Sequence, residues 1–205
     1  MPAQAPNVLV VHPSLEAKTV KELIDLIKAN PGKYSYASAG VGQTGHLAGE
    51  FLKLKYGLDM THVPFNGGGP IMNSMMGGHT LIAFLGLPSA ASFIKADKVR
   101  GLMVTTPQRS PAVPNVPTAR EAGVPEHETV FFQGVLAPAG TPKEIIDKWH
   151  ADIAEVIAMP DVKQKLEASS YAVGANTPSD FAKFIKTEVD QWAKVIEETK
   201  LPKVQ

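Results

Sequence analysis

Cysteine is absent from this chain and its net charge is zero, and each of these properties excludes several classes of protein. With 20 Lys plus Arg against 20 Asp plus Glu in 205 residues, no basic field is available to hold nucleic-acid phosphates or an anionic membrane surface. The lack of cysteine excludes disulfides and thiolate metal sites. No apolar run approaches the ~20 residues of a membrane-spanning helix. Residues 1–6 lack the basic and apolar regions of a signal peptide, so we expect none in this chain.

Motifs of the common catalytic sites are also missing. No serine lies in the Gly-x-Ser-x-Gly setting, and no carboxylate pair lies in a glycine turn for acid–base chemistry. His12, His62 and His79 are too scattered along the sequence to show a metal-ligand spacing. The sequence therefore predicts a protein that is not an enzyme and has no metal or cofactor.

What the sequence does contain is an alternation of short apolar strands with helices. Residues 7–12 form a continuous apolar run, typical of a strand buried on both faces. A capping box at Thr19 predicts the start of a helix. Further strands are expected at residues 34–39, 61–65, 81–85 and 99–105, with helices between them. This alternation indicates a largely parallel α/β sheet of about five strands.

The second part of the chain has fewer strands. Five prolines punctuate residues 106–128, which we interpret as a segment crossing between two lobes. Beyond it we expect one apolar strand and three helices, and one strand cannot form a stable sheet alone. We therefore expect a complete α/β ligand-binding lobe at 7–125 and an incomplete second lobe at 126–205. An unpaired strand would leave an apolar edge from Val130 to Leu136, which predicts self-association.

The central feature of the sequence is a glycine-rich turn between an expected strand and an expected helix. The run Gly40-Val-Gly-Gln-Thr-Gly45 matches the G-x-G-x-x-G pattern in the strand–turn–helix context that this pattern requires. Glycines let a backbone approach a ligand, and the unpaired N–H groups and dipole of a helix start attract anions. A second glycine turn begins at Asn66, after the next strand. Both turns are expected at carboxyl ends of strands, where open α/β sheets bind ligands, so we predict a carboxylate site.

Two other interpretations of the turn from Gly40 to Gly45 stay open. A nucleotide-dependent enzyme would bind pyrophosphate there, but its fingerprint expects an acid at the end of the next strand, where this sequence has Phe65-Asn66-Gly67. Alternatively, the glycines serve only a tight turn, and the chain is a truncated remnant that binds nothing. His46, close to the start of the helix, fits a packing role as well as a ligand contact.

Several longer stretches, distributed over nearly the whole chain, are specific enough to indicate a protein family. They include Pro6-Asn-Val-Leu-Val-Val-His-Pro13, Tyr36-Ala-Ser-Ala-Gly-Val-Gly-Gln-Thr-Gly-His-Leu-Ala-Gly-Glu50, His62-Val-Pro-Phe-Asn-Gly67, Leu87-Pro-Ser-Ala90 and Gly134-Val-Leu-Ala-Pro-Ala-Gly-Thr-Pro142. Together they resemble the extracytoplasmic solute-binding proteins of tripartite tricarboxylate transporters, the Bug receptors. The resemblance implies a two-lobed, periplasmic-binding-protein-like fold of type II, the Venus flytrap. It also implies capture of a small organic acid (a di- or tricarboxylate or an aromatic carboxylate) in the periplasm, for delivery to membrane transporter subunits.

The resemblance further implies where the ligand binds. In that family, one loop from each lobe holds a carboxylate through backbone donors and water. With the two glycine turns, this gives the expected ligand-binding residues: Ser38, Gly40, Val41, Gly42, Gln43, Thr44, His46, Phe65, Asn66 and Gly67. Family members usually have an N-terminal portion that builds most of the first lobe and carries its ligand loop, and we expect that portion to be absent from this sequence.

Overall fold

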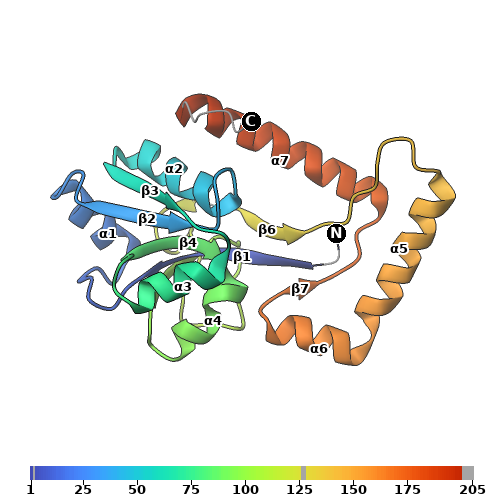
Figure 1. Ribbon diagram of the computed structural model, residues 1–205, viewed down its shortest axis with the longest axis horizontal. Helices are drawn as coiled ribbons and strands as arrows, with labels where there is room; N and C mark the ends of the chain where they lie inside the picture. Colours follow the sequence, from blue (N-terminus) through green and yellow to red (C-terminus); the bar gives the residue numbers. More distant parts are fainter. Residues whose placement is uncertain (2, 126–127, 200–205) are drawn as a thin grey trace.

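A computed structural model describes residue 1, residues 3–125 and residues 128–199 of the chain. Two sheets share their longest strand, β1, and helices surround both (Figure 1). The first part contains β1 (Ala3–Val11), α1 (Val20–Lys28), β2 (Tyr34–Ser38), α2 (Thr44–Tyr56), β3 (Met60–Pro64), α3 (Gly68–Met76), β4 (Ile82–Gly86), α4 (Leu87–Lys95) and β5 (Arg100–Val104). The second part contains β6 (Val130–Gln133), α5 (Lys143–Ala158), α6 (Pro160–Ala168), β7 (Ala172–Val173) and α7 (Pro178–Thr199).

The larger sheet has the strand order β3-β2-β4-β1-β5. Strand β2 pairs in parallel with β3 and β4, as the alternation of strands and helices predicts. Strand β1, however, is antiparallel to both β4 and β5, so the expectation of a largely parallel sheet is wrong for β1. The apolar run in β1 reports burial on both faces, and burial carries no information about strand direction.

Helices cover both faces of this sheet. Alternation along β1 directs Leu9 and Val11 into the core beneath α1 and α2, and Val8 and Val10 into the core beneath α3 and α4. The predicted capping box starts α1, because the N–H of Glu22 donates to the Thr19 hydroxyl over 3.1 Å. The larger sheet is therefore an α/β layer structure with a core on each side.

The sequence predicts a segment crossing between lobes at residues 106–128, of which 126 and 127 lie outside the described residues. Most of this connection packs against the larger sheet before the chain enters β6. Val113 and Val116 are buried in one core of the larger sheet, and Ala119 and Val124 are buried in the other. Thr118 also forms an isolated parallel bridge with the last residue of β5. Prolines interrupt regular structure in this segment, but its regularly spaced apolar residues still pack against the sheet edge.

The smaller sheet is built around the first half of β1. Residues Ala3 to Pro6 pair with β6 on one side, and Ala3 and Gln4 pair with β7 on the other. The prediction of an unpaired strand starting at Val130 is therefore wrong for β6 itself. The start of β1 carries no clear strand signal in the sequence, because its alanines, glutamine and proline lack the β-branched residues typical of a strand.

Helix α7 connects the smaller sheet with the larger part of the molecule (Figure 1). Near its start, Phe181 packs edge-to-face on Phe132 of β6, with 6.1 Å between ring centroids. Farther along, Trp192 is buried against Leu47 and Phe51 of α2. The helix that carries the ligand turn is therefore held by α7 as well as by the sheet. None of the described helices combines the length and apolar character needed to cross a bilayer.

Candidate functional site

The turn between β2 and α2 has the backbone conformation that its glycines suggest. Gly40 has a φ of 145° and Gly42 a φ of 77°, values that residues with a side chain rarely adopt. Gly45 serves a different purpose, because a Cβ there would lie 2.4 Å from the carbonyl oxygen of Phe84. The first two glycines therefore shape the turn, and the third lets α2 pack directly on β4.

Some amides of this turn are bound by the protein and others are open. The N–H of Gly42 donates to Nδ1 of His46 over 3.1 Å, and the N–H of Gln43 donates to the carbonyl of Gly40 over 3.3 Å. Within the described part of the chain, the amides of Val41 and Thr44 have no hydrogen-bond partner. Val41 is 45% exposed, so this corner of the turn is open to solvent. Two free donors at the positive end of a helix dipole can hold one carboxylate.

The second glycine turn lies directly beside the first. The N–H of Phe65 donates to the carbonyl of Ser38 over 2.9 Å, and the N–H of Gly67 donates to the carbonyl of Ala39 over 3.3 Å. Asn66, between them, is exposed. The parallel pairing of β2 with β3 brings the two turns to the same edge of the sheet. Phe65 and Gly67 thus fix the spacing of the turns, and Asn66 presents its amide side chain at their edge.

Three of the expected ligand-binding side chains point into the protein instead. Ser38 is fully buried, and its hydroxyl lies 2.7 Å from Nε2 of His62. His46 is 5% exposed and stacks on His62, with 4.0 Å between ring centroids. The hydroxyl of Thr44 donates to Oδ1 of Asn7 over 3.1 Å. These side chains support the turn from the side of the core. Of these three residues, only Thr44 has a backbone amide that we count among the open donors.

The stacked histidines are neutral near pH 7. Burial lowers the pKa of His62 to about 4, with a further contribution from neighbouring His46. Burial also lowers the pKa of His46. Since Nδ1 of His46 accepts the hydrogen bond from Gly42, the ring carries its proton on Nε2. The turn is therefore held by an uncharged acceptor.

A buried polar group beneath the histidines was not apparent from the sequence. The hydroxyl of Tyr36 donates to Oε1 of Glu50 over 2.8 Å, and Lys53 forms an ion pair with Glu50 at 2.8 Å. Burial and the Glu50 charge raise the pKa of Tyr36. The signal that could have revealed it is the spacing of His46, Glu50 and Lys53, which places all three on one face of a helix.

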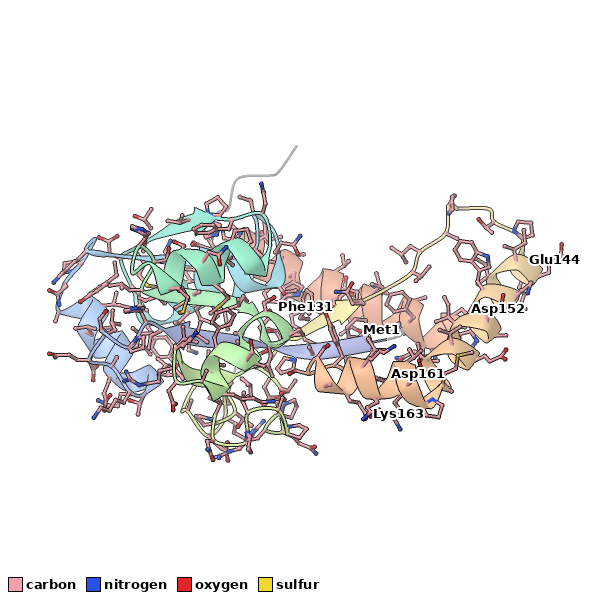
Figure 2. The ribbon with its side chains drawn as sticks, turned by 60° about the horizontal axis from the view of Figure 1, so that its bottom comes forward. Met1, Phe131, Glu144, Asp152, Asp161 and Lys163 are labelled. Carbon is pink, nitrogen blue, oxygen red and sulfur yellow. The ribbon has the colours of Figure 1, made fainter. Side chains whose placement is uncertain are left out.

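Other regions of the described chain are less suited to binding an anion. No group of three or more His, Asp or Glu is placed to hold a metal ion among these residues. A hollow of about 450 Å³ lies between α5, α7 and residues 135–141, and most of the residues lining it are apolar. Figure 2 shows α5 and α6 away from the larger sheet, with Glu144 at the outer end of α5. The β2–α2 turn is therefore the stronger candidate for a carboxylate.

Comparison with known proteins identifies the family. The model of the "tripartite tricarboxylate transporter family receptor" matches residues 2–201. A curated Pseudomonas relative, the UPF0065 protein in the tcbD–tcbE intergenic region, is 35% identical over 97% of this chain. The chain spans 60% of that relative's length.

Two solved structures of proteins with a dicarboxylate share the fold. R. palustris Rpa4515 with adipate has a TM-score of 0.89 and 32% identity, over 97% of this chain and 67% of that one. MatC from Rhodopseudomonas palustris with bound malate has a TM-score of 0.86 and 26% identity, over 95% of this chain and 67% of that one. The α/β, periplasmic-binding-protein-like fold class is thereby confirmed. This chain belongs to the tripartite tricarboxylate transporter receptor family.

Proposed function

We propose that this chain binds a small dicarboxylate at the β2–α2 turn, as part of a periplasmic receptor that serves a tripartite tricarboxylate-type transporter. The observation that carries the proposal is the pair of open amides, Val41 and Thr44, at the start of α2. The similar structures with adipate and malate support a dicarboxylate of four to six carbons. The matching family is one of transporter receptors, which disfavours the nucleotide-dependent alternative.

In this proposal, residues 7–125 are the complete ligand-binding lobe and residues 126–205 are the C-terminal part of the other lobe. The ligand then meets one turn from this chain instead of a loop from each of two lobes. Gln43 and Asn66, both exposed beside the open amides, are placed to contact the parts of the ligand beyond the bound carboxylate. The membrane subunits of the transporter would receive the ligand from the assembled receptor.

We expect this chain alone to bind adipate with a dissociation constant near millimolar. Hydrogen bonds to a charged group contribute about 1.5–3 kcal/mol each, and association opposes part of that, so two amides leave about the 4 kcal/mol that millimolar binding needs. Nuclear magnetic resonance titration with adipate, malate and the neutral diol 1,6-hexanediol measures this. Shifts at Val41 and Thr44 with the two acids only are the expected result. Micromolar affinity would contradict the single-turn site, and no shift with either acid would favour the non-binding remnant.

A pair of substitutions isolates the Thr44 amide. Proline is accepted at the first position of a helix, and Gln43 before it already has the extended conformation (φ −70°, ψ 157°) that precedes proline. Thr44→Pro removes the N–H and the hydroxyl, whereas Thr44→Val removes only the hydroxyl. Thr44→Pro should weaken adipate binding about tenfold or more relative to Thr44→Val. Equal affinities would show that this amide does not bind the ligand.

Exposed apolar residues around the hollow predict self-association. Of the stretch from Val130 to Leu136, β6 is paired, but Val135 is 47% and Leu136 is 74% exposed, close to the half-exposed Trp149 of α5. Multi-angle light scattering should show a concentration-dependent dimer. Leu136→Asp should shift it toward monomer, whereas Leu54→Asp, at an exposed leucine of α2, should not. A monodisperse wild-type monomer at high concentration would contradict this prediction.

A further inference from the structure

One buried asparagine lies where the two sheets meet. Asn7 follows the residues of β1 that pair with β6, and is itself the first to pair with β4, opposite Gly86. Only 1% of Asn7 is exposed. The second connection between the sheets lies beside it, because Thr105 follows β5 and Thr129 precedes β6. Both connections therefore pass through one small buried region.

Hydrogen bonds join the two connections. The N–H of Asn7 donates to Oγ1 of Thr105 over 2.9 Å, and the N–H of Thr105 donates to the carbonyl of Asn7 over 3.0 Å. The Thr105 hydroxyl donates to the carbonyl of Thr129 over 2.7 Å, with the Asn7 carbonyl at 3.2 Å. All three residues are buried. A movement of one connection must therefore be accommodated by the other.

The side chain of Asn7 extends this group to the ligand turn. Its Oδ1 accepts the hydroxyl of Thr44 over 3.1 Å, and its Nδ2 donates to the hydroxyl of Thr129 at 3.4 Å. Thr44 is the first residue of α2, and its amide is one of the two proposed ligand donors. One amide side chain thus contacts the ligand turn at one end and the segment entering the smaller sheet at the other.

We infer that Asn7 is a positioning residue that couples occupancy of the ligand turn to the relative orientation of the two sheets. The inference rests on the proposed function for the identity of the ligand. Because Asn7 is buried, it acts through Thr44 and does not touch the ligand. A carboxylate bound at the Thr44 amide orders the first turn of α2 and fixes the Thr44 hydroxyl. Since Asn7 has no access to water as an alternative partner, its amide must follow, and its contact with Thr129 changes with it.

Amide hydrogen exchange of the full 205-residue chain tests the coupling. Without ligand, Thr44→Val should accelerate exchange at the Thr129 amide about fivefold relative to the Ile27 amide, which lies in the core of α1 and reports global opening. The control is Thr187→Val, which removes a hydroxyl bonded to a carbonyl on the exposed face of α7. Adding sodium adipate should slow exchange at Thr129 in the wild-type protein and in the control, but not in Thr44→Val.

A double-mutant cycle on adipate affinity provides the second readout. Thr44→Val and Thr129→Val should each weaken binding about three- to tenfold, the size of one lost hydrogen bond. The double variant should lose less affinity than the product of the two single fold-losses, because both hydroxyls act through Asn7. If the affinity losses of the two single variants multiply in the double variant, and exchange at Thr129 is unchanged in Thr44→Val, the coupling is overturned. If wild-type protein does not bind adipate while Thr129 exchange still responds to Thr44→Val, the coupling holds and the proposed ligand fails.

Discussion

Gly45→Ala is expected to lower the free energy of unfolding by about 1–3 kcal/mol, the usual cost of overpacking a core. The added Cβ would lie 2.4 Å from the Phe84 carbonyl oxygen and 3.0 Å from its carbon. These are backbone atoms of β4, which cannot move aside as the end of a flexible side chain can. Helix α2 must therefore shift outward, against the roughly 1 kcal/mol that alanine gains over glycine in a helix. Urea denaturation monitored by circular dichroism measures the loss.

Gly69→Ala is the matched control, because Gly69 is also the second residue of a helix. A Cβ there meets no atom within 4 Å, so this variant should keep or slightly raise stability. Gly45→Ala should in addition abolish adipate binding, since the shift displaces the amides at the start of α2. Wild-type stability and binding in Gly45→Ala would show that α2 is not positioned by contact with β4.

Acidification from pH 7 to pH 4 is expected to destabilise the protein through His62. Its pKa lies near 6.5 in the unfolded chain and at about 4 in the folded protein, so the unfolded state takes up the proton first. Stability from this group is fully present above pH 6.5 and is lost as the pH falls to 4. We expect about 1–2 kcal/mol, because solvent screens a ring that is only partly buried. His46, whose pKa is also lowered, acts in the same direction.

His62→Gln tests the source of this acid sensitivity. Glutamine can keep a hydrogen bond to Ser38 but takes up no proton, so the decline in unfolding free energy between pH 6.5 and pH 4 should become shallower. His79→Gln, at an exposed turn, should leave it unchanged. Stability from Glu121 is also lost in this range, because Arg109 holds its folded pKa at about 2 while the unfolded carboxyl takes up its proton near pH 4.5. This loss is common to wild type and both variants, so the difference between them isolates His62. Equal slopes for wild type and His62→Gln would assign the acid sensitivity to other groups.

The same histidine stack links acidity to the ligand turn. Protonation of His46 on Nδ1 would remove the acceptor for the Gly42 amide, and a second charge would then lie 4.0 Å from His62. The buried pair disfavours this, because burial lowers both pKa values. At neutral pH both rings are therefore uncharged, and the hydrogen bond from the Gly42 amide to His46 is retained.

Local patterns were sufficient for much of the fold. The apolar run of β1, the cap at Thr19 and the strand–turn–helix around Gly40 each depend on residues close together in the sequence, and each appears in the structure. The sequence also predicted that the two glycine turns lie close together, because neighbouring parallel strands end at the same edge of a sheet. The ligand itself stays a prediction.

The amino-acid sequence by itself determined which segments become strands and helices, where the backbone needs glycine, and which family the chain resembles. The tertiary structure alone decided the antiparallel direction of β1, the partners of β6 and the packing of residues 106–125. It also turned Ser38 and His46 inward and brought Asn7 to Thr105, which is 98 residues away. The physical reason is that burial and turn conformation restrict which residue types occur at a position. Strand direction and polar partners instead depend on contacts between distant parts of the chain.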